Sequence, residues 1–256
     1  MFLDKANKIQ HDDNIFWQNE AKFWNNYGKI YRHLEASTPY KQMLADIANI
    51  IGMTNITTWL DAGCGPGTMI DLIIKNQNEY SKIVGIDFDG VMLDQATNRL
   101  KNNSKIFIQQ GDLSGHLNFQ DAAFGGIVAN LVLSYVIIFD KKYTGSEALK
   151  AVLSEMYRLL SPNGLFIWTT PIEKVNFVKV FLASWRQVFN PLTPKYIYYG
   201  PRVLSYAKKI QKKGQLGLYH FLNKEQIYSI MDEVGFKNIK IENTFAEQSY
   251  LISANK

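Results

Sequence analysis

A glycine-rich turn near the first quarter of the chain places the tightest constraint on its fold. Residues 59–70 read Trp-Leu-Asp-Ala-Gly-Cys-Gly-Pro-Gly-Thr-Met-Ile, an apolar run followed by alternate glycines at positions 63, 65 and 67. Glycine adopts positive φ at little cost and lets the backbone lie close to a bound molecule. Pro66 fits the first turn of a helix, whose unpaired amides would face that molecule. The stretch therefore predicts a buried strand over residues 57–62, a ligand-binding turn and a helix over residues 66–76.

A second strand is predicted over residues 82–87, a short β-branched run that ends in an acid. Asp87 stands at its C-terminal end, where ligands of open α/β sheets bind, and about 20 residues past the turn, where a carboxylate can accept both ribose hydroxyls. Asp89 precedes a helical run over residues 91–100 and is the predicted N-cap of that helix. Phe88 and Met92 would form apolar contacts with the base of a bound nucleoside, although either residue could instead belong to the hydrophobic core.

The remaining pattern continues the alternation of strands and helices. Strands are predicted over residues 105–109, within 119–135 and over 165–169, with a helix over residues 147–160. Residues 161–164 form a turn in which Asn163 can take a left-handed conformation. A helix over residues 223–236, capped by Asn223 and Gly235, precedes an antiparallel pair of strands over residues 237–242 and 249–254.

Size and composition limit the possible classes of protein. The chain has 256 residues, of which 46% are hydrophobic, enough for one α/β domain with insertions. Its single cysteine excludes an internal disulfide and a cysteine-based zinc site, which fits a reducing cytoplasm. The first residues lack an apolar signal region and no apolar run reaches membrane-spanning length, so a soluble, cytoplasmic protein is expected. Residues 14–51 read as two helices that cover the sheet.

A basic insert follows the fifth predicted strand. Between Lys174 and Lys224 there are ten Lys or Arg residues and no Asp or Glu. Apolar side chains repeat at helical spacing within it, with basic residues mostly elsewhere, and a second helix-like segment carries four lysines. The apolar positions are Phe177, Val178, Phe181, Leu182, Trp185 and Phe189, and the four lysines are Lys208, Lys209, Lys212 and Lys213. We interpret the insert as a helical lid with solvated lysines, or as a peripheral contact of residues 174–213 with an anionic membrane surface.

The ordered series of motifs resembles the class I S-adenosylmethionine-dependent methyltransferases. Asp61 stands two places before a Gly-x-Gly-x-Gly turn, as the acid of motif I does in that family, and Asp87 fits motif II. The resemblance spans residues 59–170. It implies an α/β fold with a doubly wound, mostly parallel seven-stranded sheet of the Rossmann-like type. The implied units of this single domain, residues 1–256, are an N-terminal helical cover (14–51), a cofactor-binding core (57–170), a helical lid at the acceptor site (172–222) and a C-terminal helix with antiparallel strands (223–256).

The resemblance also assigns roles to individual residues. The cofactor would be S-adenosylmethionine and the product S-adenosylhomocysteine. Asp112 would accept from the adenine amine, Asn130 and Leu131 would line the methionine end, and Tyr27 would contact the cofactor from the cover. The full set of implied cofactor-binding residues is Tyr27, Asp61, Ala62, Gly63, Cys64, Gly65, Gly67, Asp87, Phe88, Met92, Asp112, Leu113, Asn130 and Leu131.

The catalytic assignment departs from the family pattern. Gly125 stands where an Asp is frequent, and Ser134 and Tyr135 occupy positions where several relatives that act on small molecules have a histidine. A general base is needed only if the acceptor arrives protonated. By residue type the candidates are His33, His116, His220 and Tyr135, of which we select His220 and Tyr135. No metal site is predicted.

The motifs leave four classes of function to distinguish. A dinucleotide-binding turn would be Gly-x-Gly-x-x-Gly, whereas position 68 is Thr, which disfavours an NAD(P)-dependent oxidoreductase. The chain lacks the Asn/Asp-Pro-Pro-aromatic turn of amino-group base methyltransferases and a spare cysteine for cytosine chemistry, so no nucleic-acid partner is expected. The sequence therefore predicts methyl transfer by direct displacement to O, N or C of a small, apolar or aromatic molecule. An RNA- or protein-directed enzyme and a non-catalytic cofactor-binding module remain open alternatives.

Overall fold

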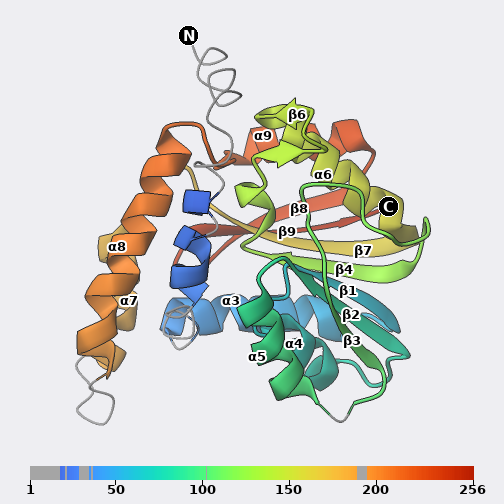
Figure 1. Ribbon diagram of the computed structural model, residues 1–256, viewed down its shortest axis with the longest axis horizontal. Coiled ribbons are helices and arrows are strands. Elements are labelled where there is room, and N and C mark those ends of the chain that lie inside the picture. The colour runs from blue at the N-terminus through green and yellow to red at the C-terminus, as the bar shows by residue number, and fades with distance from the viewer. Residues whose placement is uncertain (1–17, 21, 29–34, 36, 102, 189–194) are drawn as a thin grey trace.

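Seven strands form one sheet in the centre of the molecule (Figure 1). The computed structural model describes residues 18–20, 22–28, 35, 37–101, 103–188 and 195–256, with backbone alone at 177, 181, 185–188 and 195–199. The strand order is β3-β2-β1-β4-β7-β9-β8. The strands are β1 (Thr58–Ala62), β2 (Lys82–Asp87), β3 (Ile106–Gln110), β4 (Phe124–Asn130), β7 (Leu160–Pro171), β8 (Lys237–Thr244) and β9 (Ser249–Asn255).

Pairing within the sheet is parallel from β3 to β7 and antiparallel at the other edge. β9 pairs antiparallel with both β7 and β8, so it is inserted between them. This arrangement confirms the predicted mostly parallel, seven-stranded sheet, including the antiparallel last strand.

Helices cover both faces of the sheet. They are α3 (Thr38–Gly52), α4 (Thr68–Asn76), α5 (Gly90–Leu100), α6 (Ser146–Leu159), α7 (Phe177–Val188), α8 (Lys195–Gln215) and α9 (Lys224–Val234). In Figure 1, α3, α4 and α5 lie on one face, α6 and α9 lie on the other, and α7 and α8 stand together at one end. Residues 18–20 and 22–28 are helical, as predicted for the first part of the segment 14–51; the rest of the first predicted helix lies outside the described residues.

The central strands are mostly apolar because both of their faces are covered. On β1, Leu60 packs into the cluster that includes α6 and α9, whereas its neighbour Trp59 packs into the cluster that includes α3 and α4. Val84 and Ile83 on β2 divide between the two clusters in the same way. Successive side chains therefore anchor opposite layers, and the C-terminal ends of β1 and β2 are held in register with each other.

Three helix ends match the caps predicted from sequence. The Asp89 side chain accepts from the Val91 amide at 2.8 Å at the start of α5. Asn223 and Gln226 form a reciprocal capping box at the start of α9, and Gly235 ends that helix with φ at 111°.

Some local predictions were wrong in detail. α4 begins at Thr68 rather than at Pro66, because Gly67 takes a left-handed φ of 84° and keeps Pro66 in the preceding turn. The predicted turn at residues 161–164 lies within β7, where the register shifts between Phe124 and Gly126 on β4, although Asn163 has the expected positive φ of 61°. A small hairpin of β5 (Ile138–Phe139) and β6 (Tyr143–Thr144), preceded by the 3₁₀ turn η2 (Leu133–Tyr135), was not predicted.

Gly126 on β4 has no space for a side chain, which allows a test of the packing in this core. A Cβ built on Gly126 would lie 2.5 Å from the buried Trp59 ring, whereas one built on Gly125 would lie 3.1 Å from its nearest neighbour, the Ile56 side chain. Overpacking a rigid core costs about 1–3 kcal/mol. We expect Gly126→Ala to lower the free energy of unfolding by about 2 kcal/mol in urea denaturation, and Gly125→Ala to lower it less. Equal stability of the two variants would contradict the packing of Trp59 against this strand.

Candidate functional site

The glycine turn joins the ends of β1 and β2. Gly63, Gly65 and Gly67 all have positive φ, at 75°, 50° and 84°. The amides of Gly63 and Cys64 both donate to the Ile86 carbonyl at 2.8 Å, which fixes the turn against β2. A Cβ on Gly65 would meet no atom within 4 Å, and Gly65 lines a cavity. The turn therefore presents bare backbone to that cavity, as the sequence predicts.

Asp87 connects this turn to the next helix. Its Oδ2 accepts from the Gly65 amide at 2.8 Å, and its Oδ1 accepts from the Asp89 amide at 3.0 Å. Burial raises the pKa of Asp87, and the amides of Asp89 and Gly65 oppose the rise. Both carboxylate oxygens are thus oriented at the cavity wall by backbone donors, and each retains a lone pair for a ligand hydroxyl.

Asp61 is buried without a hydrogen-bond partner. Neither of its carboxyl oxygens has a partner among the described residues, and the side chain is fully buried at the C-terminal end of β1. Burial, reinforced by the charge of Asp87, raises its pKa well above the ordinary value; the Ile70 amide opposes the rise but is not within hydrogen-bond geometry. A buried acceptor of this kind is satisfied by a bound water or by donors that arrive with a ligand.

Replacement of Asp61 tests the free-energy cost of burying its carboxylate without a hydrogen-bond partner. Because its folded-state pKa lies above the unfolded value, the carboxyl contributes most to stability below the unfolded pKa, and that contribution is lost as pH rises through the folded pKa. We expect Asp61→Asn to stabilise the ligand-free protein by about 1 kcal/mol at neutral pH, with a gain that grows from acid to neutral pH. Thermal unfolding across pH measures this, with the exposed Asp94→Asn as control. A variant that is less stable at every pH would contradict it.

A cavity of about 1050 Å³ extends from the glycine turn to a wall of aromatic residues. Pockets for one drug-sized ligand span roughly 300–1,000 Å³, so this cavity can accommodate two small molecules side by side. The structure brings most of the predicted site residues to its wall, namely Tyr27, Gly63, Cys64, Gly65, Asp87, Phe88, Met92, Asp112, Leu113, Asn130, Leu131 and Tyr135.

Four predicted residues do not line the cavity. Asp61 and Ala62 lie behind the turn, buried in β1, and a Cβ on Gly67 would face the Leu100 side chain at 2.8 Å. His220, predicted as a catalytic base, is buried; its Nε2 is 2.8 Å from the Val136 carbonyl oxygen, and its own amide donates to the Ser134 carbonyl. Burial also lowers its pKa. His220 therefore links its own segment to the backbone at Ser134 and Val136. It does not line the cavity in which a methyl acceptor could bind.

Tyr135 lies in the cavity wall, but its surroundings disfavour a role as a base. Its ring packs against Trp24 and Tyr219, with centroid distances of 4.7 and 5.0 Å. Burial raises the pKa of its phenol far above the ordinary value, so the hydroxyl stays protonated at neutral pH. Tyr135 can donate a hydrogen bond to a ligand, whereas proton abstraction is disfavoured. His33, a further candidate by residue type, lies outside the described residues.

The methionine end of the predicted site is held by a polar network at the end of β4. The Asn130 amide donates to the Tyr40 hydroxyl at 3.0 Å, and its carbonyl accepts from the Thr169 hydroxyl at 2.6 Å. The next residue, Leu131, has a positive φ of 52°, and its amide donates to the Thr169 hydroxyl at 2.9 Å. Strained backbone of this kind costs free energy and is common at ligand sites.

Sequence reasoning missed the hairpin that forms the far rim of the cavity. Asp140 and Lys141 have positive φ, and the Lys142 amide donates to the Phe139 carbonyl, which closes a tight turn. The Asp140 amide donates to the Ser114 carbonyl at 2.7 Å, so the hairpin is tied to the loop that carries the predicted adenine contact. Lys141 and Lys142 both line the cavity. The signal was present as a β-branched run followed by a polar turn.

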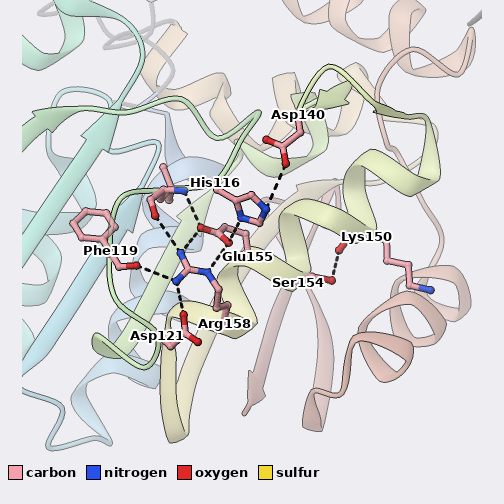
Figure 2. A network of polar contacts seen from close by, with 9 residues as sticks. His116, Phe119, Asp121, Asp140, Lys150, Ser154, Glu155 and Arg158 are labelled. Carbon is pink, nitrogen blue, oxygen red and sulfur yellow. Dashed lines mark hydrogen bonds and ion pairs between the residues drawn. The ribbon is translucent and has the colours of Figure 1, made fainter.

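An ion pair between the buried Glu155 and the partly exposed Arg158 supports the same loop (Figure 2). Arg158 donates to both Glu155 oxygens, at 2.8 and 2.6 Å, and to the Leu117 carbonyl at 3.1 Å, while the Leu117 amide donates to Glu155 at 2.8 Å. One ring nitrogen of His116 lies 2.9 Å from Glu155 and the other 3.4 Å from Asp140. The network joins α6 to the loop at residues 111–121 and to the hairpin. His116 is thereby engaged in support of the loop.

The fold and the site together define a Rossmann-like methyltransferase architecture. A sheet with an antiparallel inserted last strand, a glycine turn after β1 and a carboxylate at the end of β2 are the parts that the sequence resemblance implied. A sequence profile described as a methyltransferase domain matches residues 60–168, which contain all three of the predicted acidic motifs.

Relatives and solved structures agree with this class. The chain is 22% identical over 240 residues to a demethylmenaquinone methyltransferase of Staphylococcus aureus, covering 94% of this chain and 90% of that protein. A methyltransferase structure from Mesorhizobium loti matches with a TM-score of 0.55 at 16% identity, over 87% of this chain and 100% of that one. A phosphoethanolamine N-methyltransferase from Haemonchus contortus, solved with S-adenosylmethionine, matches with a TM-score of 0.61 at 14% identity, over 91% of this chain and 57% of that one.

Residues 60–168 form a methyltransferase domain, and the chain shares its fold with solved S-adenosylmethionine-dependent methyltransferases. It is an enzyme of this class, and its cofactor is S-adenosylmethionine. The residues present fit that cofactor, since a bare backbone turn and an oriented carboxylate at Asp87 meet at one end of the cavity, while the unpartnered carboxyl of Asp61 lies buried behind the turn.

Proposed function

We propose that the protein methylates O, N or C of a small molecule with an apolar or aromatic body, bound in the half of the cavity away from the glycine turn. One observation carries this proposal: a single cavity continues from Gly65 and Asp87 to a wall that includes Trp24, Tyr135 and Ile137. Apolar walls with a few polar groups are typical of small-molecule sites. The Staphylococcus aureus and Haemonchus contortus proteins are both named for small-molecule acceptors, which supports the proposal.

The cofactor half of the proposal assigns each polar residue a role in binding. S-adenosylmethionine supplies a methyl group on a positively charged sulfur, which an acceptor can displace directly. Asp87 would accept the ribose hydroxyls, and Asp112, whose Oδ1 already accepts from the Ser114 amide at 2.8 Å, would accept from the adenine amine. Asn130 and Leu131 would line the methionine end. Phe88, half exposed beside the cavity, would cover the adenine face.

The acceptor half would be built by segments outside the sheet. Trp24 packs against Tyr135 and Tyr219, and Phe23 packs against Tyr206 of α8 at a centroid distance of 5.2 Å. Glu20 accepts from Lys213 and from the Tyr219 hydroxyl, which holds the N-terminal helix against the end of α8. These contacts support the role of residues 172–222 as a lid over the acceptor.

Positioning would supply most of the rate in this arrangement. The described residues that line the cavity include no histidine, Tyr135 stays protonated, and Glu20 is already engaged by Lys213 and Tyr219. Holding the acceptor atom close to the methyl group can lower the barrier by roughly 7–11 kcal/mol without proton transfer by the enzyme. The geometry therefore favours an acceptor that needs no enzymatic base.

Transfer of a labelled methyl group tests the function. The purified protein is incubated with methyl-labelled S-adenosylmethionine and fractionated cell extract, and the label is traced to small molecules, RNA or protein. We expect the label in organic-soluble small molecules, and transfer lowered by about 10- to 100-fold in Asp87→Ala at low cofactor concentration. Label mainly in RNA or protein would favour a macromolecular acceptor. Tight cofactor binding without transfer to any fraction would favour a non-catalytic module.

A further inference from the structure

Helices α7 and α8 present apolar side chains to solvent. In Figure 1 the two helices lie side by side at one end of the molecule, with α8 along the edge. On α7, Val178 and Leu182 are 64% and 59% exposed, and in the α8 region Leu204 and Leu216 are 39% and 59% exposed. Val178 and Leu182 are four residues apart, so they share one side of α7. Single exposed apolar side chains are ordinary, but four on two adjacent helices need an explanation.

Lysines lie between the apolar positions on α8. Leu204, Lys208, Lys212 and Leu216 follow one another at intervals of four residues, which places them along one side of the helix. Lys208, Lys209 and Lys212 are all exposed, and no carboxylate in the described part of the chain pairs with them. By contrast, Lys213 turns inward to Glu20, and Lys179 of α7 pairs with Glu247 at 2.7 Å.

This distribution leaves a positive face with apolar side chains at its ends. The segment from Lys174 to Lys224 contains no acid that could neutralise it from within. A nucleic acid would be bound by the lysines alone and would gain nothing from exposed leucines, whereas an anionic bilayer engages both kinds of side chain. Within the described residues, no helix is long and apolar enough to cross a membrane.

We propose that the exposed side of α8, with Val178 and Leu182 of α7, docks on the surface of an anionic phospholipid bilayer. The lysines would lie among the lipid headgroups, and the apolar side chains would enter the headgroup boundary. The inference goes beyond the proposed function and does not depend on the nature of the acceptor. On the opposite side of α8, Tyr206 packs against Tyr27 and Lys213 pairs with Glu20; because Tyr27 and Glu20 both line the cavity, the docking helix also borders the proposed acceptor site.

Vesicle co-sedimentation of the full-length protein tests the electrostatic part. Vesicles of equal parts phosphatidylglycerol and phosphatidylcholine are compared with vesicles of phosphatidylcholine alone, at low and high salt. We expect binding to the anionic vesicles that weakens at high salt. The triple variant Lys208→Gln, Lys209→Gln, Lys212→Gln should lower the partition coefficient by about 100-fold. The control replaces Lys75, Lys101 and Lys237, which are exposed elsewhere, with Gln; it makes the same change in net charge and should retain binding.

A double variant tests the contribution of the exposed apolar side chains to membrane binding. Val178→Ser with Leu182→Ser should weaken binding to anionic vesicles at both salt concentrations while leaving the salt dependence in place. Binding of S-adenosylhomocysteine by every variant serves as the check of folding, so a failure here is distinct from a failure of the proposed function. Absence of binding to anionic vesicles at low salt, or equal losses in the triple variant and its control, would overturn the proposal. Binding to duplex DNA in place of vesicles would also overturn it.

Discussion

Replacing Glu155 with alanine should lower the free energy of unfolding by about 3–5 kcal/mol, the largest effect on stability that we expect for one side chain. The Glu155 side chain is 1% exposed and accepts from Arg158 and from the Leu117 amide (Figure 2). Its removal would leave a guanidinium with only Asp121 and two backbone carbonyls as partners, together with an unpaired buried amide. Urea denaturation measures the change.

An exposed ion pair provides the matched control for this change. Glu233 pairs with Lys150 at 2.9 Å, but the two side chains are 56% and 39% exposed. Exposed pairs contribute less than about 1 kcal/mol, so Glu233→Ala should scarcely alter the denaturation midpoint. Similar losses for the two variants would contradict the anchoring role of Glu155.

The same carboxylate should make stability depend on pH. Burial alone would raise the pKa of Glu155, but hydrogen bonds from Arg158, the Leu117 amide and His116 outweigh it and hold the pKa below its ordinary value. A depressed folded-state pKa gives stability that is present above the unfolded pKa, 4.5, and lost as pH falls through the folded pKa. Glu155→Gln should therefore unfold with a shallower dependence on pH below about 4.5 than the wild type does.

The second large effect concerns cofactor affinity. Asp87→Ala should weaken binding of S-adenosylhomocysteine by about 10- to 100-fold, because charge-assisted hydrogen bonds contribute about 1.5–3 kcal/mol. The alanine variant also leaves the Gly65 amide, which donates to Asp87 at 2.8 Å, without its partner. Asp87→Asn keeps the shape and one acceptor, so its loss should be smaller. Equilibrium dialysis with labelled ligand measures these affinities.

The control for Asp87 is a carboxylate outside the cavity. Asp94 is exposed on α5 and does not line the cavity, so Asp94→Ala makes the same change in net charge without touching the site. It should bind S-adenosylhomocysteine as the wild type does. Wild-type affinity in Asp87→Ala would remove Asp87 from the cofactor site.

Most of the sheet could be predicted because its signals are local. The strand that ends in Asp87 was predicted with the bounds that the structure gives, since a fully buried parallel strand is a continuous apolar run with a sharp polar end. The caps at Asp89 and Asn223 were predictable for the same reason, because each side chain bonds amides two or three residues away. The side-chain contacts of these elements are encoded within a few residues of sequence.

The parts that were missed depend on contacts between distant residues. His220 looked like a base because it precedes a helix, but its ring contacts the Val136 carbonyl, 84 residues away in the chain. Neither Glu155 nor Arg158 is singled out from the sequence, because their further partners lie on the distant loop at Leu117 and Phe119. The aromatic end of the cavity likewise joins Trp24 to Tyr135 and Tyr219. Sequence periodicity identifies such residues as apolar without showing what they face.

The central claim is that one cavity, built on the glycine turn and Asp87, binds the cofactor of a methyltransferase. Calorimetric titration of the wild-type protein with S-adenosylhomocysteine, and separately with NAD⁺, tests it most directly. We predict saturable binding of S-adenosylhomocysteine at one site per chain and no detectable binding of NAD⁺. Binding of NAD⁺ with no heat from S-adenosylhomocysteine would contradict the claim.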